Sequence, residues 1–294
     1  MKKLIFKGVA TALVTPFDEN NEIDYYSFEN LIDLQLKAKT DALVVCGTTG
    51  EASTLTYEER KSLISLAKEK VKGKIPIIVG AASNNAEVSK RLILDAEKSG
   101  ADAILAVTPY YNKTTQRGLV ELFELYAKTA SVPVVAYNVP SRTGVDILPE
   151  TYRKIEKIKN VVAVKEADGD VNKLALSLSA SKNLAFYSGN DGCILPFLSL
   201  GAKGVISVLS NVCPKAVKGL CDDFFNGQTE KARRLQLKYT ELIGALFCTV
   251  NPIPLKYVMS RLSLCKNVLR SPLTTLDERE KKICDGALKK YFGV

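Results

Sequence analysis

The chain of 294 residues contains no histidine. This absence excludes Ser-His-Asp and Cys-His nucleophiles, and it excludes zinc or iron sites that depend on an imidazole ligand. Any acid–base chemistry must therefore use Lys, Tyr, Asp, Glu, Cys or groups of the substrate itself. We predict no metal site.

Long apolar segments and paired cysteines are also missing. No apolar run approaches the ~20 residues of a transmembrane helix. Lys7 and Gly8 interrupt the N-terminal apolar stretch, and the run 9–14 is short for a signal peptide. The cysteines number seven and include no CxxC spacing, which argues against a disulfide framework or a zinc knuckle. We expect a cytoplasmic protein with reduced cysteines and no membrane partner.

The net charge is a weaker indication of the partners of the protein. Lys and Arg number 41 against 32 Asp and Glu, a formal net charge of +9. The basic residues are scattered over the predicted helices and are not clustered with aromatic residues, so we expect no nucleic-acid partner. The pattern is typical of a solvated basic surface, which could also attract small carboxylate substrates.

Short runs rich in Val, Ile and Ala recur along the chain, separated by amphipathic segments such as 57–71, 87–99 and 118–129. Most of these runs are apolar throughout, as parallel strands covered on both faces require. The predicted strands are eight in number: 9–15, 42–46, 77–80, 103–108, 134–138, 161–165, 185–188 and 204–209.

This repetition predicts an α/β fold, a closed (β/α)8 TIM barrel of the usual ~250 residues with a C-terminal helical extension. The alternative is an open doubly wound sheet, which would need a glycine-rich loop after the first strand, whereas the sequence there is PFDE. Beyond about Cys221 the strand-like runs stop, and helices are predicted over 228–248, 254–262 and 276–291. We therefore predict a catalytic barrel over 1–224 and a helical subdomain over 225–294.

The chemistry of such barrels lies at the C-terminal ends of the strands. The sixth strand ends in Lys165, where burial would favour the neutral amine that forms a Schiff base with a carbonyl substrate. The alternative is a lysine that extends into solvent or pairs with Glu166. The fifth strand supplies Tyr137, a possible proton carrier, and the loop after it supplies Arg142, a possible carboxylate ligand. Taken singly, these could be a barrel-filling aromatic and a surface ion pair.

The other strand ends are polar as well. The second ends in the turn Gly47-Thr48-Thr49-Gly50, whose amides and hydroxyls could bind an anion. The fourth, seventh and eighth end in TPYYN, SGND and VIS. Because all of these polar groups fall at the same rim, the sequence predicts an active site there.

At these residues the chain resembles the dihydrodipicolinate synthases, members of the pyruvate-dependent class I aldolase superfamily. The resemblance runs almost from end to end, through GVATALVTPF, GTTGE, TPYYNK, YNVPSRTG, VVAVKEA, YSGND and GVISV. It implies a lyase that condenses pyruvate with L-aspartate-4-semialdehyde to give 4-hydroxy-tetrahydrodipicolinate, in diaminopimelate and lysine biosynthesis. It also implies no cofactor beyond the covalent Schiff base, and a homotetramer built as a dimer of dimers.

The resemblance also implies catalytic roles. Lys165 matches the Schiff-base lysine, and Tyr137 matches the acid–base residue that relays protons. Thr48 and Tyr111 match the other members of the hydroxyl relay, and the second tyrosine of the family reaches in from a neighbouring subunit.

The substrate-binding roles follow in the same way. Thr49, together with Thr48, matches the site for the carboxylate of pyruvate, and Gly189 and Ile206 match residues that line it. Arg142 matches the arginine that holds the semialdehyde. The related N-acetylneuraminate lyases and keto-deoxy-sugar aldolases usually lack this arginine, so a sibling lyase is the second hypothesis. A catalytically silent anion-binding protein is the third.

The chain departs from the family at the lysine-effector site. Tyr57 and Arg60 stand where lysine-inhibited members carry histidines, and Ala52 stands at a position that is often serine. Asn84, Glu87 and Tyr110 match the family pattern. We expect weak or absent feedback inhibition by lysine.

Overall fold

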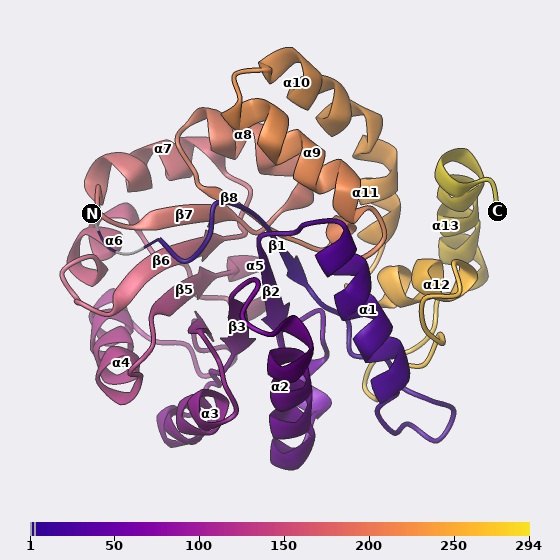
Figure 1. The fold of residues 1–294 in the computed structure, drawn as a ribbon. Helices are drawn as coiled ribbons and strands as arrows, with labels where there is room; N and C mark the ends of the chain where they lie inside the picture. The colour runs from indigo at the N-terminus through magenta and orange to yellow at the C-terminus, as the bar shows by residue number, and fades with distance from the viewer. Residues whose placement is uncertain (1, 3) are drawn as a thin grey trace.

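The computed structural model describes residue 2 and residues 4–294. Its strands close into a barrel in chain order, and every neighbouring pair is parallel (Figure 1). The barrel confirms the predicted fold, and each strand falls on a predicted run. The strands are β1 (Gly8–Ala12), β2 (Ala42–Val45), β3 (Ile77–Gly80), β4 (Ala103–Val107), β5 (Val134–Asn138), β6 (Val161–Glu166), β7 (Ala185–Ser188) and β8 (Gly204–Ser207).

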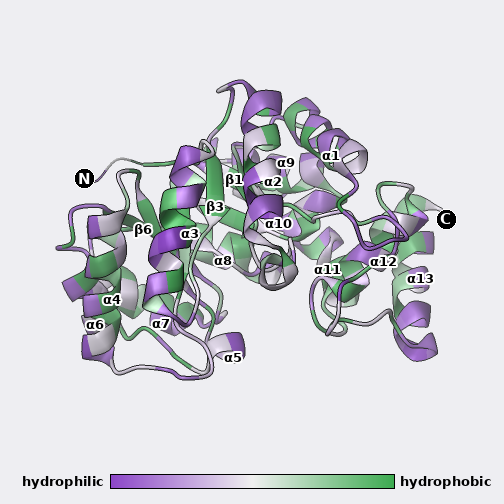
Figure 2. Cartoon of the chain, turned by 90° about the horizontal axis from the view of Figure 1, so that it is seen from below, coloured by the Kyte–Doolittle hydropathy of each residue, from purple (hydrophilic) through white to green (hydrophobic). Residues whose placement is uncertain are grey.

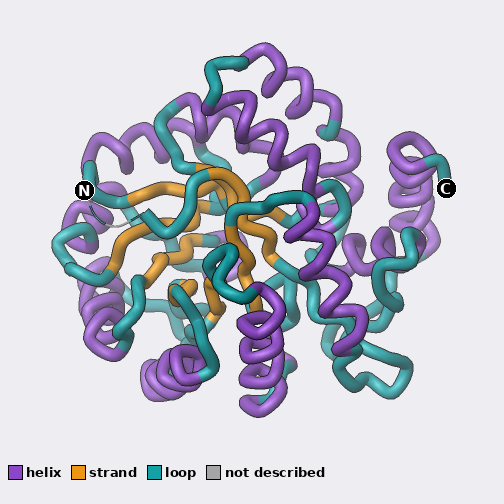
Figure 3. Tube along the Cα trace, viewed as in Figure 1, coloured by secondary structure: helices purple, strands orange, loops and turns teal. Residues whose placement is uncertain are grey.

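Helices surround the strands on the outside, as Figure 3 shows with strands in orange and helices in purple. The helices of the barrel are α1 (Tyr25–Lys37), α2 (Tyr57–Val71), α3 (Ala86–Lys98), α4 (Gln116–Thr129), α5 (Pro140–Thr143), α6 (Pro149–Ile155), α7 (Val171–Ala180), α8 (Ile194–Ser199) and α9 (Pro214–Phe225). Short 3-10 turns lie at Ala52–Thr54, Asp191–Cys193 and Leu209–Asn211.

Local capping fixes where the helices begin. Thr56 and Glu59 form a reciprocal capping box at the start of α2, so this helix spans the predicted residues 57–71. Asn85 caps α3, and Thr115 caps α4 through its hydroxyl. The Thr115 cap lets α4 begin at Gln116, two residues before the predicted start.

The strands alternate between an inner and an outer apolar layer, because successive side chains of a strand point to opposite faces. The inner layer includes Ala10, Val44, Leu105 and Tyr137, and the outer layer packs against the helices. Figure 2 shows the strands as mostly hydrophobic, with polar residues concentrated on the outer helices. This double burial explains the uninterrupted apolar runs of the sequence.

The first strand is shorter than predicted. β1 ends at Ala12, and beyond it Val14 N–H donates to the side chain of Asn211 at 3.2 Å. The Thr15 hydroxyl donates to the carbonyl of Gly50 at 2.7 Å. Leu13 N–H still donates to the carbonyl of Val44 in β2, and from Val14 onward the chain contacts loops at the rim instead of extending the strand.

The C-terminal segment carries α10 (Thr229–Lys238), α11 (Thr240–Leu246), α12 (Ile253–Arg261) and α13 (Glu278–Phe292), of which α12 and α13 lie beside the barrel in Figure 1. The prediction of one helix over 228–248 was wrong. Tyr239 leaves helical geometry and stacks on Tyr291, with ring centroids 5.7 Å apart, while the Thr240 hydroxyl binds the Gln236 carbonyl. The predicted division at 224/225 falls at the last residue of α9 and stays a prediction.

Among the residues that the structure describes, no helix has the length and apolar character needed to cross a bilayer. Within the same residues, no three His, Cys, Asp or Glu side chains gather in an arrangement that could hold a metal ion.

Candidate active site

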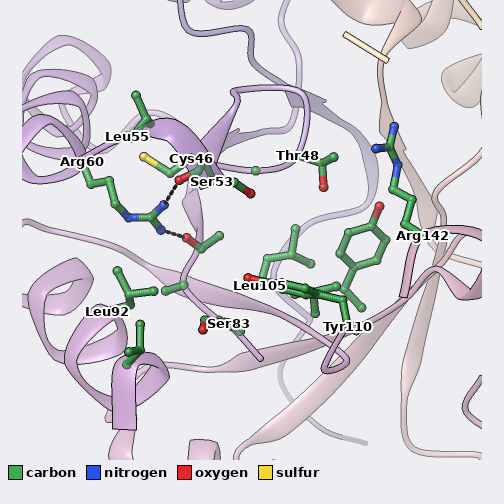
Figure 4. Close-up of a pocket in the computed structure, with 18 of the residues that line it drawn as sticks. Cys46, Thr48, Ser53, Leu55, Arg60, Ser83, Leu92, Leu105, Tyr110 and Arg142 are labelled. Atoms are coloured by element: carbon green, nitrogen blue, oxygen red, sulfur yellow. Dashed lines mark hydrogen bonds between the residues drawn. The ribbon is translucent and has the colours of Figure 1, made fainter. Parts of the chain in front are cut away.

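A cavity of about 670 Å³ opens at the carboxyl ends of β2, β3, β4 and β5. Thr48, Tyr137 and Arg142 line one part of it, which places these predicted site residues together. In Figure 4, Thr48 and Arg142 lie at one end of the cavity, and Arg60 and Leu92 lie at the other. The predicted rim of the barrel therefore carries a real depression with polar groups on its walls.

Lys165 lies inside the barrel directly beside Tyr137. The two residues are paired in the register of β5 and β6, and Lys165 Nζ lies 4.2 Å from the centre of the Tyr137 ring. The Lys165 side chain is buried, with 6% of its surface exposed, so it does not extend into solvent. Within the described part of the chain it forms no ion pair and no hydrogen bond through Nζ. The amine is therefore buried, unpaired and next to a phenol.

Gly189 and Ile206 bound the same interior. A Cβ on Gly189 would lie 3.1 Å from Lys165 Cε and 2.6 Å from Ala167 Cβ, so only glycine leaves room for the lysine. Ile206 is buried in the inner apolar layer. Neither residue lines the cavity of Figure 4, and Lys165 does not line it either. Tyr137 belongs to both the cavity wall and the inner layer, and it therefore connects the two.

The turn after β2 presents an arrangement suited to an anion. Gly50 N–H and Glu51 N–H close the turn on the carbonyls of Gly47 and Thr48 at 3.1 Å each. The N–H groups of Thr48 and Thr49 donate no hydrogen bond within residues 2 and 4–294. Free amides beside hydroxyls are the usual components of a carboxylate site.

A residue that sequence reasoning missed joins this turn to the loop after β5. The side chain of Asn251, between α11 and α12, donates through Nδ2 to Thr49 Oγ1 at 3.0 Å. Its main-chain carbonyl accepts from Arg142 Nη2, also at 3.0 Å. Arg142 forms no ion pair within the described residues, so the surface ion pair considered from the sequence is absent. Asn251 lies about 200 residues from Thr49 in the chain, and no local pattern indicates the contact.

The outward-facing neighbours of Tyr137 and Lys165 form a second network behind the strands. Asn138 Nδ2 donates to Glu166 Oε1 at 2.8 Å, and the Tyr152 hydroxyl donates to Glu166 Oε2 at 2.7 Å. Lys173 Nζ lies 3.7 Å from Glu166 and 2.7 Å from Asp168, and it also pairs with Asp146. Glu166 therefore pairs with Lys173 and not with Lys165.

Burial dominates the electrostatics of this network. Desolvation raises the pKa of the Glu166 carboxyl to about 7, although Lys173 acts in the opposite direction. Asn138 also accepts from Ile147 N–H and donates to Asp146, at 3.1 and 2.8 Å. The network thus fixes the pairing of β5 with β6. It also fixes Asp146 and Ile147, at the end of the segment that carries Arg142.

A buried ion pair holds the residue after the GTTG turn. Lys256 of α12 is fully buried and pairs with Glu51, and its Nζ also donates to the Val268 carbonyl at 2.8 Å. Burial lowers the pKa of Lys256, because desolvation outweighs the attraction of Glu51. Glu51 Oε2 accepts from Arg270 N–H at 3.1 Å. The C-terminal segment therefore contacts both Thr49 in this turn, through Asn251, and Glu51 directly after it, through Lys256 and Arg270.

Tyr111 is set apart from the other predicted site residues. Its side chain is 91% exposed, its φ is +67°, and it does not line the cavity of its own chain. Its neighbour Tyr110 does line that cavity.

The predicted effector residues lie partly at the far end of the same cavity. Ala52, Tyr57, Arg60 and Tyr110 line it, whereas Asn84 and Glu87 do not. The buried Arg60 guanidinium donates to the carbonyls of Ala52 and Gly80, the first at 3.1 Å (Figure 4). The Arg91 guanidinium lies 3.9 Å from the centre of the Tyr57 ring.

Comparisons with known proteins agree with this arrangement. The model of the dihydrodipicolinate synthetase family matches residues 5–291. A 4-hydroxy-tetrahydrodipicolinate synthase of Alkaliphilus oremlandii is 49% identical over 287 residues, which cover 97% of this chain and 99% of that protein. The crystal structure of dihydrodipicolinate synthase from Thermotoga maritima gives a TM-score of 0.95 at 43% identity, covering 98% of this chain and 99% of that one. A monomeric dihydrodipicolinate synthase variant gives 0.94 at 43% identity and 97% coverage of each chain.

Proposed function

The chain belongs to the dihydrodipicolinate synthetase family, and from that premise we propose that it is a 4-hydroxy-tetrahydrodipicolinate synthase. This lyase joins pyruvate to L-aspartate-4-semialdehyde on the route to diaminopimelate and lysine. The observation that carries the proposal is the buried amino group of Lys165, which has no ion-pair partner among the described residues and lies 4.2 Å from the Tyr137 ring at the cavity end of the barrel.

Lys165 is the nucleophile of the proposed reaction. Its Nζ attacks the ketone carbon of pyruvate, and the adduct loses water to give a protonated imine. The protonated imine draws electrons from the methyl group of the pyruvate unit. The methyl group releases a proton, and the imine is thereby converted into an enamine. The enamine carbon attacks the aldehyde, whose oxygen takes up a proton, and the amino group of the semialdehyde then displaces Lys165 as the ring closes. No metal or organic cofactor is needed for these steps.

Binding groups at the rim orient the two substrates. The N–H groups of Thr48 and Thr49, which donate no hydrogen bond within the described residues, and the hydroxyls of both threonines hold the carboxylate of pyruvate, so that its ketone faces Lys165. Gly189 and Ile206 bound the space around the pyruvate. Arg142 binds the carboxylate of the semialdehyde with the N–H groups that Asn251 leaves free.

Proton transfer follows a chain of hydroxyls in place of imidazole. Tyr137 exchanges protons with the imine and the departing water, and Thr48, which lines the same cavity, continues the chain. Tyr111 completes the relay from a neighbouring subunit. Its exposure, and its absence from the residues that line the cavity of its own chain, support that assignment. We propose a homotetramer built as a dimer of dimers, and the free state of all seven cysteines fits a cytoplasmic enzyme.

Borohydride trapping tests the nucleophile. With pyruvate, we expect a mass adduct on the peptide that contains Lys165, and we expect none in Lys165→Ala. A wild-type protein that forms no adduct would exclude Schiff-base chemistry. Tyr137→Phe is expected to keep the fold and lose most turnover, and near-full activity would remove Tyr137 from the relay.

A substrate comparison tests the specificity. The rate with pyruvate and aspartate semialdehyde is compared with the cleavage of N-acetylneuraminate and keto-deoxygluconate. We expect only the first reaction at a high rate, because Arg142 favours the semialdehyde. Preferred cleavage of either sugar acid would favour the sibling lyase.

We also propose weak feedback inhibition by lysine. The Arg60 guanidinium at the far end of the cavity repels a second cation, and two of its N–H groups are already bonded to the carbonyls of Ala52 and Gly80. Titration of the activity with lysine is expected to show little inhibition, and a submillimolar inhibition constant would contradict this proposal.

A further inference from the structure

Asn251 contacts the groups that bind both proposed substrates. It is 6% exposed and lies in the segment between α11 and α12, outside the strands and helices of the barrel. Its side-chain amide bonds Thr49 after β2, and its main-chain carbonyl bonds Arg142 after β5, each at 3.0 Å. One residue of the C-terminal segment therefore connects loops from separate strands of the barrel.

The direction of the Thr49 bond has a chemical consequence. A threonine hydroxyl can donate its single hydrogen and can also accept. Because the Thr49 oxygen accepts from Asn251 Nδ2, its own hydrogen remains available for another acceptor. A carboxylate is such an acceptor, and the free N–H groups of Thr48 and Thr49 lie in the same turn. The amide of Asn251 thus prepares Thr49 as a donor to an anion.

The Arg142 bond acts through a different atom. The Arg142 side chain is exposed and forms no ion pair within the described residues, so Asn251 is what restrains its guanidinium. Restraint before binding lowers the entropy lost when the arginine closes on a carboxylate. Because the acceptor is a main-chain carbonyl, a change of the Asn251 side chain leaves it in place. The two effects can therefore be separated by mutation.

We propose that Asn251 is a positioning residue for both carboxylate-binding groups, through its side-chain amide on Thr49 and its main-chain carbonyl on Arg142. This inference rests on the proposed function, because it assigns pyruvate to Thr49 and the semialdehyde to Arg142. It assigns the C-terminal segment a direct part in substrate alignment.

The test separates the two substrates. In Asn251→Ala we expect the apparent Kd for pyruvate, measured by borohydride trapping without semialdehyde, to rise about tenfold, the loss of one well-placed hydrogen bond. The KM for semialdehyde should change less than about twofold, because the main-chain carbonyl remains. Asn251→Asp keeps the shape but accepts the Thr49 hydrogen and adds a negative charge. We expect it to weaken pyruvate binding about a hundredfold.

A double-mutant cycle distinguishes positioning from a general loss of structure. If Asn251 acts through Thr49, Asn251→Ala in a Thr49→Val background should add little further loss in pyruvate binding. Asn160→Ala is the matched control, since Asn160 bonds the carbonyls of Ala130 and Val132 away from the cavity. It should lower stability without separating the two substrate constants.

Several outcomes would overturn the inference. Unchanged pyruvate binding in Asn251→Ala, full additivity with Thr49→Val, or an Asp variant that binds pyruvate as well as wild type would each contradict it. A wild-type protein that forms no pyruvate adduct would overturn the proposed function and this inference together. An adduct in the wild type with unchanged affinity in Asn251→Ala overturns this inference alone.

Discussion

Gly189 lies so close to the proposed nucleophile that a side chain has no room there. An added Cβ would be 2.6 Å from Ala167 Cβ and 3.1 Å from both the Glu166 carbonyl and Lys165 Cε. Ala167 and the Glu166 carbonyl are held by the end of a paired strand and cannot move freely. We expect Gly189→Ala to displace Lys165, to lower kcat more than tenfold and to reduce stability by about 1–3 kcal/mol. Steady-state kinetics and urea unfolding measure both effects.

Gly286→Ala supplies the control for that substitution. Gly286 lies within α13, and an added Cβ would meet no atom within 4 Å. The variant should keep full activity and gain up to about 1 kcal/mol of stability, because alanine favours a helix. Equal activity in the two glycine variants would show that the space beside Lys165 is not limiting.

Glu166 makes the stability of the protein depend on pH. Burial raises the pKa of its carboxyl to about 7 in the folded state, above the ordinary glutamate value of 4.5 that the unfolded chain should approach. Between these values the folded state holds a proton that the unfolded state has released. The contribution of Glu166 to stability is therefore present at low pH and is lost as pH rises through about 7.

Comparison with Glu166→Gln isolates this contribution. Relative to the glutamine variant, the wild type should lose roughly 2–3 kcal/mol of unfolding free energy as pH rises from about 4.5 to 7.5. Urea unfolding at a fixed protein concentration over this pH range measures the difference. A difference that stays constant, or that grows in favour of the wild type as pH rises, would contradict the assignment.

A buried ion pair holds α12 against the chain that follows β2, and its contribution to the stability of the protein can be predicted. Lys256 and Glu51 are both buried, and each offsets the charge of the other. Lys256→Met should destabilise the protein by about 3–5 kcal/mol, because it leaves Glu51 buried and unpaired. The double variant Lys256→Met/Glu51→Gln should recover much of that loss. Thermal unfolding checks both, and a double variant as unstable as the single one would contradict the pairing.

The elements themselves were largely predictable from the sequence. Each strand of the barrel carries an apolar run that two-sided burial requires, and α2 begins where Thr56 and Glu59 form a capping box. The break at Tyr239 was not predictable, because the residues 228–248 keep a helical pattern through it. It depends on stacking against Tyr291, which follows 52 residues later and belongs to α13.

The part of the candidate site that depends on strand positions was also predictable from the sequence, whereas contacts between distant segments were not. Lys165 and Tyr137 lie in the last two residues of their strands, and Thr48 and Arg142 lie in the loops that follow strands. The carboxyl ends of the strands meet at one rim of the barrel, whatever the conformation of the loops. Strand alternation places Glu166 opposite to Lys165 and could have excluded their pairing from the sequence alone. Contacts of the C-terminal segment, such as Asn251 with Thr49, depend on how α11 and α12 pack. No periodicity within the chain encodes them.

At the scale of the whole molecule, the backbone conformation and exposure of Tyr111 are not accounted for by contacts within its own chain. A tyrosine at φ +67° is conformationally strained, and a side chain that is 91% exposed gains little burial within its own chain. Strain of this kind persists where it serves a site or an interface. The proposed dimer gives it a purpose, since Tyr111 would complete the hydroxyl relay of the neighbouring subunit.

Complementation between two inactive variants tests that arrangement. Lys165→Ala lacks the nucleophile and Tyr111→Phe lacks the relay hydroxyl, so each variant alone should lose most turnover. In a mixed dimer, one site combines an intact Lys165 with the intact Tyr111 of its partner, while the other site lacks both groups. Equal co-expression should yield mixed dimers in about half of the population, and hence about a quarter of the wild-type activity. If Tyr111 instead serves its own subunit, every site remains defective and mixing restores no activity.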